Sequence, residues 1–180
     1  MGINLAIASN LDRSLFNYGV RDSRRKCIFI SHKKEDEEAA IAIGDYLTKI
    51  ANVNIYLDVK DCILQEAVSE ENDRKIVTSI QTGLNLSTHL LCVISDQTRL
   101  SWWVPYEIGF ADRQNVEITS LMLKKADDIP SFLKINKSLK NTDDFLHYIS
   151  DFGEYGSLTR DFKYEELSNS NLSSIQKYIR

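Results

Sequence analysis

The sequence predicts an α/β fold, namely a flavodoxin-like, doubly wound parallel sheet of about five strands with helices on both faces. Short apolar segments alternate with amphipathic segments along most of the chain, which is the order produced by right-handed strand–helix–strand crossovers. The apolar segments are continuous runs, and such runs favour parallel strands that are buried on both faces.

The expected strands are short runs rich in β-branched and aromatic residues. The run HLLCVIS is the most apolar and is expected at the centre of the sheet. The strands are expected at residues 26–31, 53–58, 89–95, 117–124 and 138–141.

Helices are expected where apolar residues recur every three or four positions. In the first of them, Ala39, Ile43 and Leu47 form one stripe, and acidic residues occupy the first turn, where the helix dipole favours them. The helices are expected at residues 35–50, 74–84, 102–113 and 142–151.

Length and composition indicate one globular domain with an extension at each end. The chain has 180 residues, 43% of them hydrophobic, and its net charge of −4 indicates no general attraction to nucleic acid or anionic membranes. No apolar run approaches the ~20 residues of a membrane span, and the N-terminus does not resemble a signal peptide. We expect the domain at residues 26–151, an N-terminal extension at 1–25, and a C-terminal extension at 152–180 that is helical near 162–179.

The cysteines indicate a reducing, cytoplasmic location. Cys27 and Cys92 lie inside apolar runs, Cys62 is distant from both, and no C-x-x-C pair occurs, so neither a metal site nor a dithiol centre is expected. The acidic segment from Asp58 to Asp73 lacks EF-hand spacing and is expected to be a loop without calcium. The sequence also lacks the dinucleotide-binding, Walker, nucleophile-elbow and zinc-protease motifs.

A ligand of an open parallel sheet binds beyond the carboxyl ends of the strands. Ser31, His32 and Lys33 follow the first expected strand, where side chains and helix N-terminal amides could hold phosphate or ribose hydroxyls. Tyr56 and Asp58 lie at the end of the second strand. The start of the helix at 102–113 lies on the same edge, so these segments are expected to form one site.

The segment SWWVPYEIGF, residues 101–110, carries the strongest catalytic candidate, Glu107. Pro105 is tolerated in the first turn of a helix, which places Glu107 early in that helix. Trp103 and Tyr106 give the carboxylate an apolar rim, which would raise its pKa, whereas the helix dipole would lower it. A carboxylate in this position can stabilise a developing cation, such as the oxocarbenium-like transition state of glycosidic cleavage.

Aromatic residues near this edge are candidates for stacking a planar heterocycle. A ring at a strand end that faces another ring on the helix would sandwich such a ligand. Tyr56 and Trp103 are the candidates, whereas Trp102 is expected to pack under the helix.

Three segments, in order, resemble the Toll/interleukin-1 receptor (TIR) domain family over about residues 26 to 150. CIFISHKKED resembles the first strand and box 1 of the family, with Ser31 and Asp36 at pattern positions. IYLDVKD resembles the second strand entering the BB loop, which here is long, acidic and without the usual glycine or proline. SIQTGLNLSTHLLCVISDQTRLSWWVPYEIGFA is similar to the run that ends in the S-x-W-x-x-x-E-[IL] helix.

The resemblance implies an NAD⁺ glycohydrolase or cyclase, which cleaves the nicotinamide–ribose bond and forms ADP-ribose or a cyclic ADP-ribose isomer. It assigns the catalytic glutamate to Glu107, the tryptophan four residues earlier to Trp103, and the base-stacking aromatic to Tyr56. NAD⁺ is then the substrate, and no cofactor or metal is expected. The predicted substrate-binding residues are Ser31, His32, Lys33, Tyr56, Asp58, Trp103 and Tyr106.

A TIR domain that stands alone on its chain resembles the TIR component of Thoeris antiphage defence. This implies a homo-oligomer formed through TIR–TIR contacts and a nucleotide product that activates a separate effector. Two other functions stay open. A non-enzymatic TIR scaffold or signalling adaptor would associate without consuming NAD⁺, and a nucleoside deoxyribosyltransferase-like enzyme would share the sheet and the carboxylate on a helix.

Overall fold

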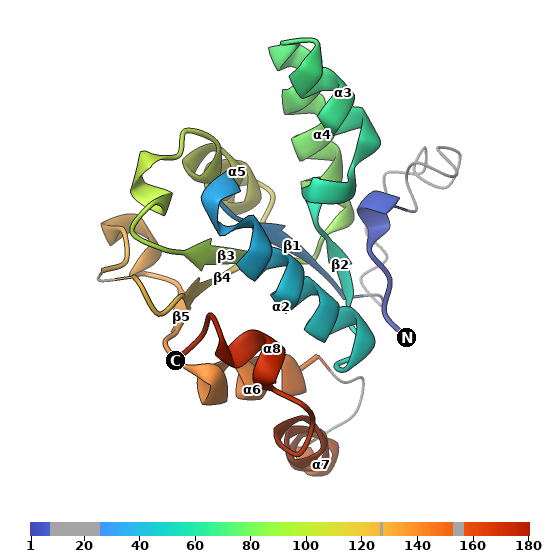
Figure 1. Cartoon of the computed structure of the whole chain (residues 1–180), viewed down its shortest axis with the longest axis vertical. Coiled ribbons are helices and arrows are strands. Elements are labelled where there is room, and N and C mark those ends of the chain that lie inside the picture. Colours follow the sequence, from blue (N-terminus) through green and yellow to red (C-terminus); the bar gives the residue numbers. More distant parts are fainter. Residues whose placement is uncertain (8–25, 127, 153–156) are drawn as a thin grey trace.

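The computed structural model describes residues 1–7, 26–126, 128–152 and 157–180, and it confirms the predicted α/β fold. A five-stranded, parallel sheet forms the centre of the domain (Figure 1). Every predicted strand is found, although β2 ends two residues earlier than expected and β5 begins one residue earlier. The strands are β1 (Cys27–Ser31), β2 (Asn54–Tyr56), β3 (His89–Ile94), β4 (Glu117–Met122) and β5 (Lys137–Leu139).

The strand order is β2-β1-β3-β4-β5, so β3 is the central strand, as its apolar sequence predicts. Every residue of β1 and all but the first residue of β3 are buried, because helices cover both faces of the sheet. The direction of winding reverses between β1 and β3. Ser31 of β1 pairs with Cys92 of β3 at this point, and ligands of doubly wound sheets bind in the crevice beyond such a reversal.

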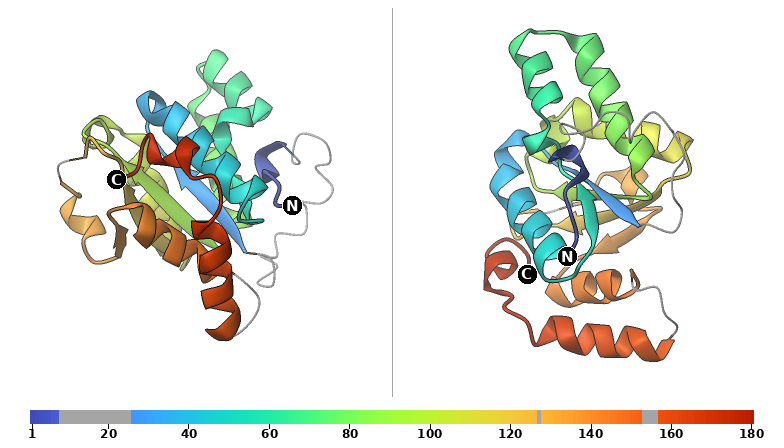
Figure 2. Two further views of the ribbon diagram at one scale, coloured as in Figure 1. Left: turned by 60° about the horizontal axis from the view of Figure 1, so that its bottom comes forward. Right: turned by 90° about the vertical axis from the view of Figure 1, so that its right-hand side faces the viewer.

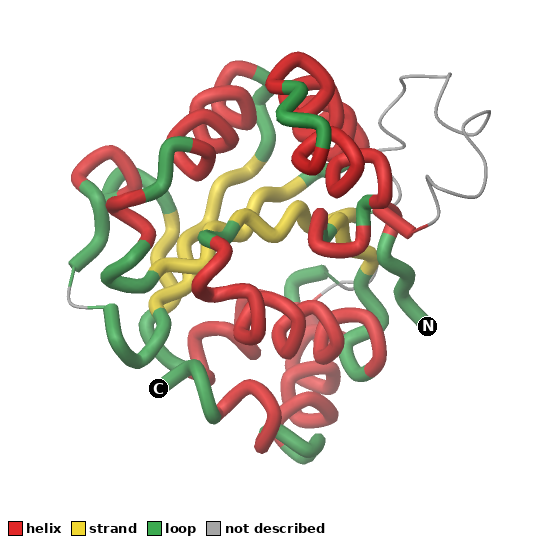
Figure 3. The backbone as a smooth tube through the Cα atoms, turned by 45° about the horizontal axis from the view of Figure 1, so that its top comes forward, coloured by secondary structure: helices red, strands yellow, loops and turns green. Residues whose placement is uncertain are grey.

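Two apolar cores lie on opposite faces of the sheet. The helices are α2 (Glu37–Lys49), α3 (Cys62–Ser69), α4 (Asp73–Leu86), α5 (Trp103–Arg113), α6 (Thr142–Ser150), α7 (Ser157–Ser168) and α8 (Ser173–Gln176). Ile43 of α2 and Phe145 of α6 belong to one core, and Leu84 of α4 and Ile108 of α5 belong to the other. Figure 3 shows the strands between these two groups of helices.

The acidic segment that was expected to be a loop is a helical hairpin of α3 and α4, which projects from the sheet (Figure 2). Asp61 begins α3, because its carboxylate accepts the backbone N–H groups of Ile63 and Leu64 at 3.0 and 3.2 Å. Asn72 caps α4 in the same way. Leu64 and Ala67 are buried against the domain, so the loop prediction was wrong because it weighed the exposed acids over this apolar face.

The C-terminal extension packs into the core on the α2 face of the sheet. Leu167, Ile175 and Ile179 are buried there, and Ile179 forms an antiparallel bridge with Leu123 beyond β4. The single helix expected near 162–179 is two helices, α7 and α8. The polar run SNSN separates them, and the Asn171 side chain accepts the backbone N–H of Ser173 at 3.1 Å.

The N-terminal extension, predicted at residues 1–25, is described over residues 1–7, and residues 8–25 lie outside the described part of the chain. Asn4 forms a parallel bridge with Ile55 and thereby covers the outer edge of β2. Gly2 lies close to the backbone of the same segment, and a Cβ atom on it would stand 2.2 Å from the Val53 carbonyl oxygen. A side chain at this position would therefore separate the N-terminal segment from β2.

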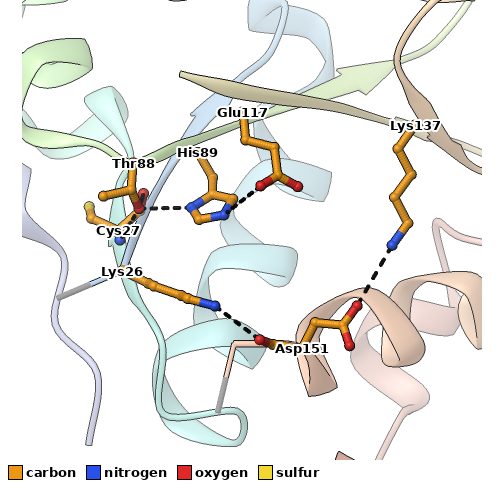
Figure 4. Close-up of polar contacts among 7 residues, drawn as sticks. All are labelled: Lys26, Cys27, Thr88, His89, Glu117, Lys137 and Asp151. Carbon is orange, nitrogen blue, oxygen red and sulfur yellow. Dashed lines mark hydrogen bonds and ion pairs between the residues drawn. The ribbon is translucent and has the colours of Figure 1, made fainter. Parts of the chain in front are cut away.

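The amino-terminal edge of the sheet is held by a polar network (Figure 4). The imidazole of His89 lies between the Thr88 hydroxyl, 2.7 Å from Nδ1, and the Glu117 carboxylate, 3.2 Å from Nε2. Lys26 Nζ donates to the backbone carbonyl of Asp151 at 3.0 Å. These contacts join β3 to β4, and the residue before β1 to the residue after α6, at the edge that lies opposite the expected site.

Gly83 of α4 lies against the buried ring of Tyr56, and a Cβ atom on it would stand 2.4 Å from Tyr56 Cε1. Gly83→Ala should therefore lower the free energy of unfolding by about 1–3 kcal/mol, measured by urea denaturation. Gly109→Ala in α5 is the control, because no described residue other than its chain neighbours and its own helix backbone lies within 4 Å of its Cβ position. It should be neutral or stabilising by up to about 1 kcal/mol. Equal losses in the two variants would contradict the packing of Tyr56 on α4.

Candidate functional site

A cavity of about 460 Å³ opens beyond the carboxyl ends of β1 and β2. Its walls come from the segment after β1, the 3₁₀ turn η3 (Asp58–Lys60), the α3–α4 hairpin and the start of α5. This volume is ordinary for a small-molecule site. The charged and aromatic lining residues are His32, Lys33, Lys34, Glu35, Glu37, Asp58, Trp102, Trp103 and Glu107.

Glu107 reaches this cavity from the buried face of α5. The helix begins at Trp103, so Pro105 lies in its first turn as predicted, and the Ser101 hydroxyl accepts the backbone N–H of Val104 at 3.2 Å. Val104, Glu107 and Ile108 share the buried face, which leaves the Glu107 side chain only 4% exposed. The helix therefore carries a carboxyl group into the apolar layer at the end of the sheet.

Ser31 orients the Glu107 carboxyl group through a hydrogen bond from the end of β1. Ser31 is the last residue of β1, and its hydroxyl donates a hydrogen bond of 2.5 Å to Glu107 Oε2. Cys92, its partner in β3, is completely buried beside them, and burial together with the charge of Glu107 raises the pKa of its thiol. Ser31 was predicted to bind substrate, but it lies behind Glu107 and is absent from the cavity lining.

Burial dominates the protonation of Glu107. It raises the pKa of this carboxyl group to about 8; the charge of Asp58 adds to the shift, and the Ser31 hydrogen bond opposes it. From the sequence, apolar surroundings were expected to raise the pKa of Glu107 and the helix dipole to lower it. In the structure the effect that raises the pKa is the larger one. Burial thus favours the neutral form of Glu107 in the ligand-free protein.

Asp58 brings a carboxylate from the segment after β2 to the same cavity. It begins η3 directly after β2, and its Oδ1 atom lies 3.8 Å from His32 Nδ1. Burial raises the pKa of Asp58, and the charge of His32 opposes that shift. The His32 side chain is only 6% exposed, and the carbonyl oxygen of Ile30 lies 3.4 Å from its Nδ1. Both residues line the cavity, and their role in binding substrate stays a prediction.

Lysines also line the cavity. Lys33 and Lys34 follow β1, and Lys34 begins the 3₁₀ turn η2 (Lys34–Asp36). Lys33 Nζ lies 3.2 Å from Glu35 Oε1, and the Lys33 side chain is 17% exposed. The cavity is therefore lined by both carboxyl and ammonium groups, which suits a ligand that carries charges of both signs.

Trp103 lies at the cavity wall, where it was predicted, whereas Trp102 differs from its prediction. Trp103 lines the cavity and is 39% exposed, but Trp102 is 90% exposed and does not pack under the helix, as was expected. Tyr106 supports Trp103 by an edge contact, with the ring centroids 6.1 Å apart, and its hydroxyl accepts a hydrogen bond of 2.8 Å from Gln81. Tyr106 is absent from the cavity lining, so its placement corrects the prediction that it binds substrate directly.

Tyr56 is a core residue, which corrects the prediction that it stacks a substrate base. Its ring is 2% exposed and lies parallel to that of Phe29, with centroids 5.5 Å apart. Its hydroxyl donates to Asp61 Oδ2 at 2.6 Å, and burial raises its pKa. The residue was placed at the correct strand end, but its side chain points into the α4 face of the sheet.

The apolar cavity wall was missed by sequence reasoning. Leu64 and Val68 of α3 and Ile76 and Ile80 of α4 line the cavity opposite α5. The spacing of Ile76 and Ile80 predicted a helical stripe, but nothing in that spacing showed that part of the stripe faces a ligand site. Recognising Asp61 as a helix N-cap would have revealed α3 and thereby the second wall.

Glu107→Gln should stabilise the fold at alkaline pH. Folding raises the pKa of Glu107 from ~4.3 in the unfolded chain to about 8. The folded protein therefore loses stability as the pH rises between these two values. The neutral amide avoids this loss. We expect a gain in the free energy of unfolding of about 2 kcal/mol or more at pH 9 and a much smaller gain at pH 5, measured by urea denaturation. Asp112→Asn, an exposed carboxylate on the same helix, should show no such pH dependence. Equal gains for Glu107→Gln at both pH values would contradict the burial of this group.

No group of three His, Cys, Asp or Glu side chains that could hold a metal ion occurs among the described residues. Within the same ranges, no helix combines the length and apolar character needed to cross a membrane.

Comparison with known proteins identifies the family. The family model described as TIR domain matches residues 28–153, from β1 past the end of α6, which is well over half of the chain. A search of curated proteins finds no significant match. The matched region contains the five-stranded sheet and the helix that carries Glu107. The chain therefore belongs to the TIR domain family.

Proposed function

We propose that this TIR domain is an NAD⁺ glycohydrolase or ADP-ribosyl cyclase, in which Glu107 is the catalytic carboxylate. The observation that carries the proposal is the buried Glu107, held by Ser31 in a cavity that also presents Trp103. TIR domains include NAD⁺-cleaving enzymes, and here the glutamate of the family pattern lies in a cavity of suitable size. The proposed reaction uses NAD⁺ as substrate and requires no metal or further cofactor.

In the proposed reaction the bond between C1′ of the ribose and the pyridinium nitrogen breaks. The bonding electron pair stays on the nitrogen, so nicotinamide leaves as a neutral molecule and the positive charge moves to the ribosyl group. Ionised Glu107 stabilises that oxocarbenium-like cation. Water then attacks C1′ and releases a proton, which gives ADP-ribose. Attack by an adenine nitrogen or a ribose hydroxyl of the same molecule gives a cyclic isomer and likewise releases a proton.

The remaining lining residues would position the substrate. The half-exposed Trp103 offers a ring face for the nicotinamide, and Lys33 and Lys34 offer positive charge for the pyrophosphate. The apolar side chains of α3 and α4 exclude water from the wall opposite Glu107. Exclusion of water favours attack by a group of the substrate itself, and hence a cyclic product.

TIR domains commonly self-associate, and we extend the proposal to a homo-oligomeric enzyme. Leu100 and Trp102 are 62% and 90% exposed beside the cavity, which supports an apolar contact near its mouth. The resemblance to the TIR component of Thoeris defence supports a role in antiphage immunity, with a nucleotide product that acts on a separate effector.

The same exposed residues favour one second candidate, a non-enzymatic TIR scaffold. Such a scaffold would associate through Leu100 and Trp102 without consuming NAD⁺. Incubation with NAD⁺, with chromatography of the products and measurement of the oligomeric state, separates the two functions. Association with no loss of NAD⁺ at any protein concentration would favour the scaffold.

Glu107→Gln should reduce NAD⁺ consumption by at least about 10³-fold, because the amide keeps the side-chain shape but cannot carry the charge that stabilises the cation. The measurement is nicotinamide release, followed by chromatography. Asp112→Asn on the same helix should keep wild-type activity. Undiminished turnover by Glu107→Gln would disprove the mechanism.

The pH dependence of kcat/KM should follow the ionisation of Glu107 in the free enzyme. Because its pKa is about 8 and the ionised form is active, kcat/KM should rise about tenfold between pH 6 and 7 and level off above pH 8. Initial rates in a constant-ionic-strength buffer series test this, with Asp112→Asn as a control that should retain the profile. A flat profile from pH 6 to 9 would be inconsistent with a neutral resting Glu107.

A further inference from the structure

Asp58 is a half-buried carboxylate of the cavity to which the proposed reaction assigns no step. Its Oδ1 atom is buried and has no hydrogen-bond partner among the described residues. His32 Nδ1, 3.8 Å away, is too distant for a hydrogen bond. An unpartnered carboxylate oxygen at this depth is costly unless a ligand offsets it, and it lies on the wall of a ligand-sized cavity.

Asp58 and Glu107 line the same cavity and act on each other electrostatically, since the charge of Asp58 contributes to the raised pKa of Glu107. Ser31 and Cys92, which lie beside Glu107, supply no positive charge. Burial raises the pKa of Asp58 and the charge of Asp61 adds to that shift, whereas the charge of His32 and the backbone N–H groups of Asp58 and Val59 oppose it.

Lys33, one of the two lysines that line the cavity, is already ion-paired with Glu35 at 3.2 Å. The helix α4 supplies Ile76 and Ile80 to the wall, which are apolar. A cation that enters the cavity would therefore favour ionisation of both Asp58 and Glu107.

We propose that Asp58 and Glu107 form a cation-selective subsite for the positively charged pyridinium ring, and that Asp58 determines the specificity for oxidised over reduced nicotinamide nucleotides. The inference rests on the proposed function, since it concerns the substrate of the same cavity. The pyridinium ring carries one positive charge that offsets the two carboxylates, and Trp103 adds an aromatic face that attracts a flat cation. The dihydronicotinamide of NADH is neutral and leaves Asp58 unpaired.

Binding of the cationic ring also makes Glu107 ready for catalysis. The positive charge favours ionisation of Glu107, so its proton passes to the solvent as the ligand enters. The subsite thus couples recognition of the leaving group to the appearance of the catalytic charge. A neutral ring would leave Glu107 protonated.

Calorimetric binding at pH 7 tests the inference without turnover. The probes are carba-NAD⁺, in which a CH₂ group replaces the ring oxygen of the nicotinamide ribose and prevents cleavage, and NADH. Wild-type protein should bind carba-NAD⁺ at least about tenfold more tightly than NADH, and Asp58→Asn should reduce that ratio by about tenfold. Glu66→Gln, an exposed acid on α3 outside the cavity lining, should keep the wild-type ratio within about twofold.

Proton release by the wild-type protein gives a second measurement that does not depend on the folding of a variant. Titrations in buffers of different ionisation enthalpy should show release of about 0.5–1 proton per site with carba-NAD⁺ and almost none with NADH. Three outcomes would each overturn the inference. They are equal proton release with carba-NAD⁺ and NADH, a folded Asp58→Asn variant that keeps the wild-type ratio of the two affinities, and no binding of carba-NAD⁺. If the proposed function itself were wrong, the result would differ: wild-type protein would leave NAD⁺ intact, whatever its relative affinity for carba-NAD⁺ and NADH.

Discussion

The pairing of β1 with β3 at the centre of the sheet is the constraint on which the site depends. Both strands are buried on both faces, so helices must cover both sides, and the chain winds away from these strands in opposite directions. That reversal brings Ser31 and Cys92 side by side and leaves a crevice beyond them. The start of α5 enters this crevice and meets the end of β1 through the bond between Ser31 and Glu107.

The placement of a carboxyl group in this apolar layer opposes stability and serves the proposed chemistry. Burial of Glu107 disfavours its charge, and Asp58 strengthens that effect. A single hydroxyl donor keeps the group oriented without providing positive charge. Such an arrangement stores electrostatic free energy that a cationic ligand or transition state releases, whereas a simple structural role would call for a paired or solvated carboxylate.

Segments outside the alternating pattern complete the domain. The α3–α4 hairpin forms the wall opposite α5, while the C-terminal segment contributes Leu167, Ile175 and Ile179 to the core on the other face. Neither role followed from local sequence. The acidic residues in and around α3 suggested a loop, because they are more conspicuous in the sequence than the apolar face of the helix. The buried residues of the C-terminal segment were missed because they are widely spaced and a polar run separates α7 from α8.

The amino-acid sequence by itself determined the order of strands and helices, the parallel central sheet, and the position of Glu107, Asp58 and the residues after β1 on one edge. It could do so because hydrophobic period and chain connectivity leave few topologies open. Only the tertiary structure decided which way each side chain points. Tyr56 is the last residue of β2 but packs between Phe29 and α4, whereas Trp102 is exposed. The charge state of Glu107 was decided there too, because desolvation and the field of Asp58 depend on distances between segments far apart in the chain.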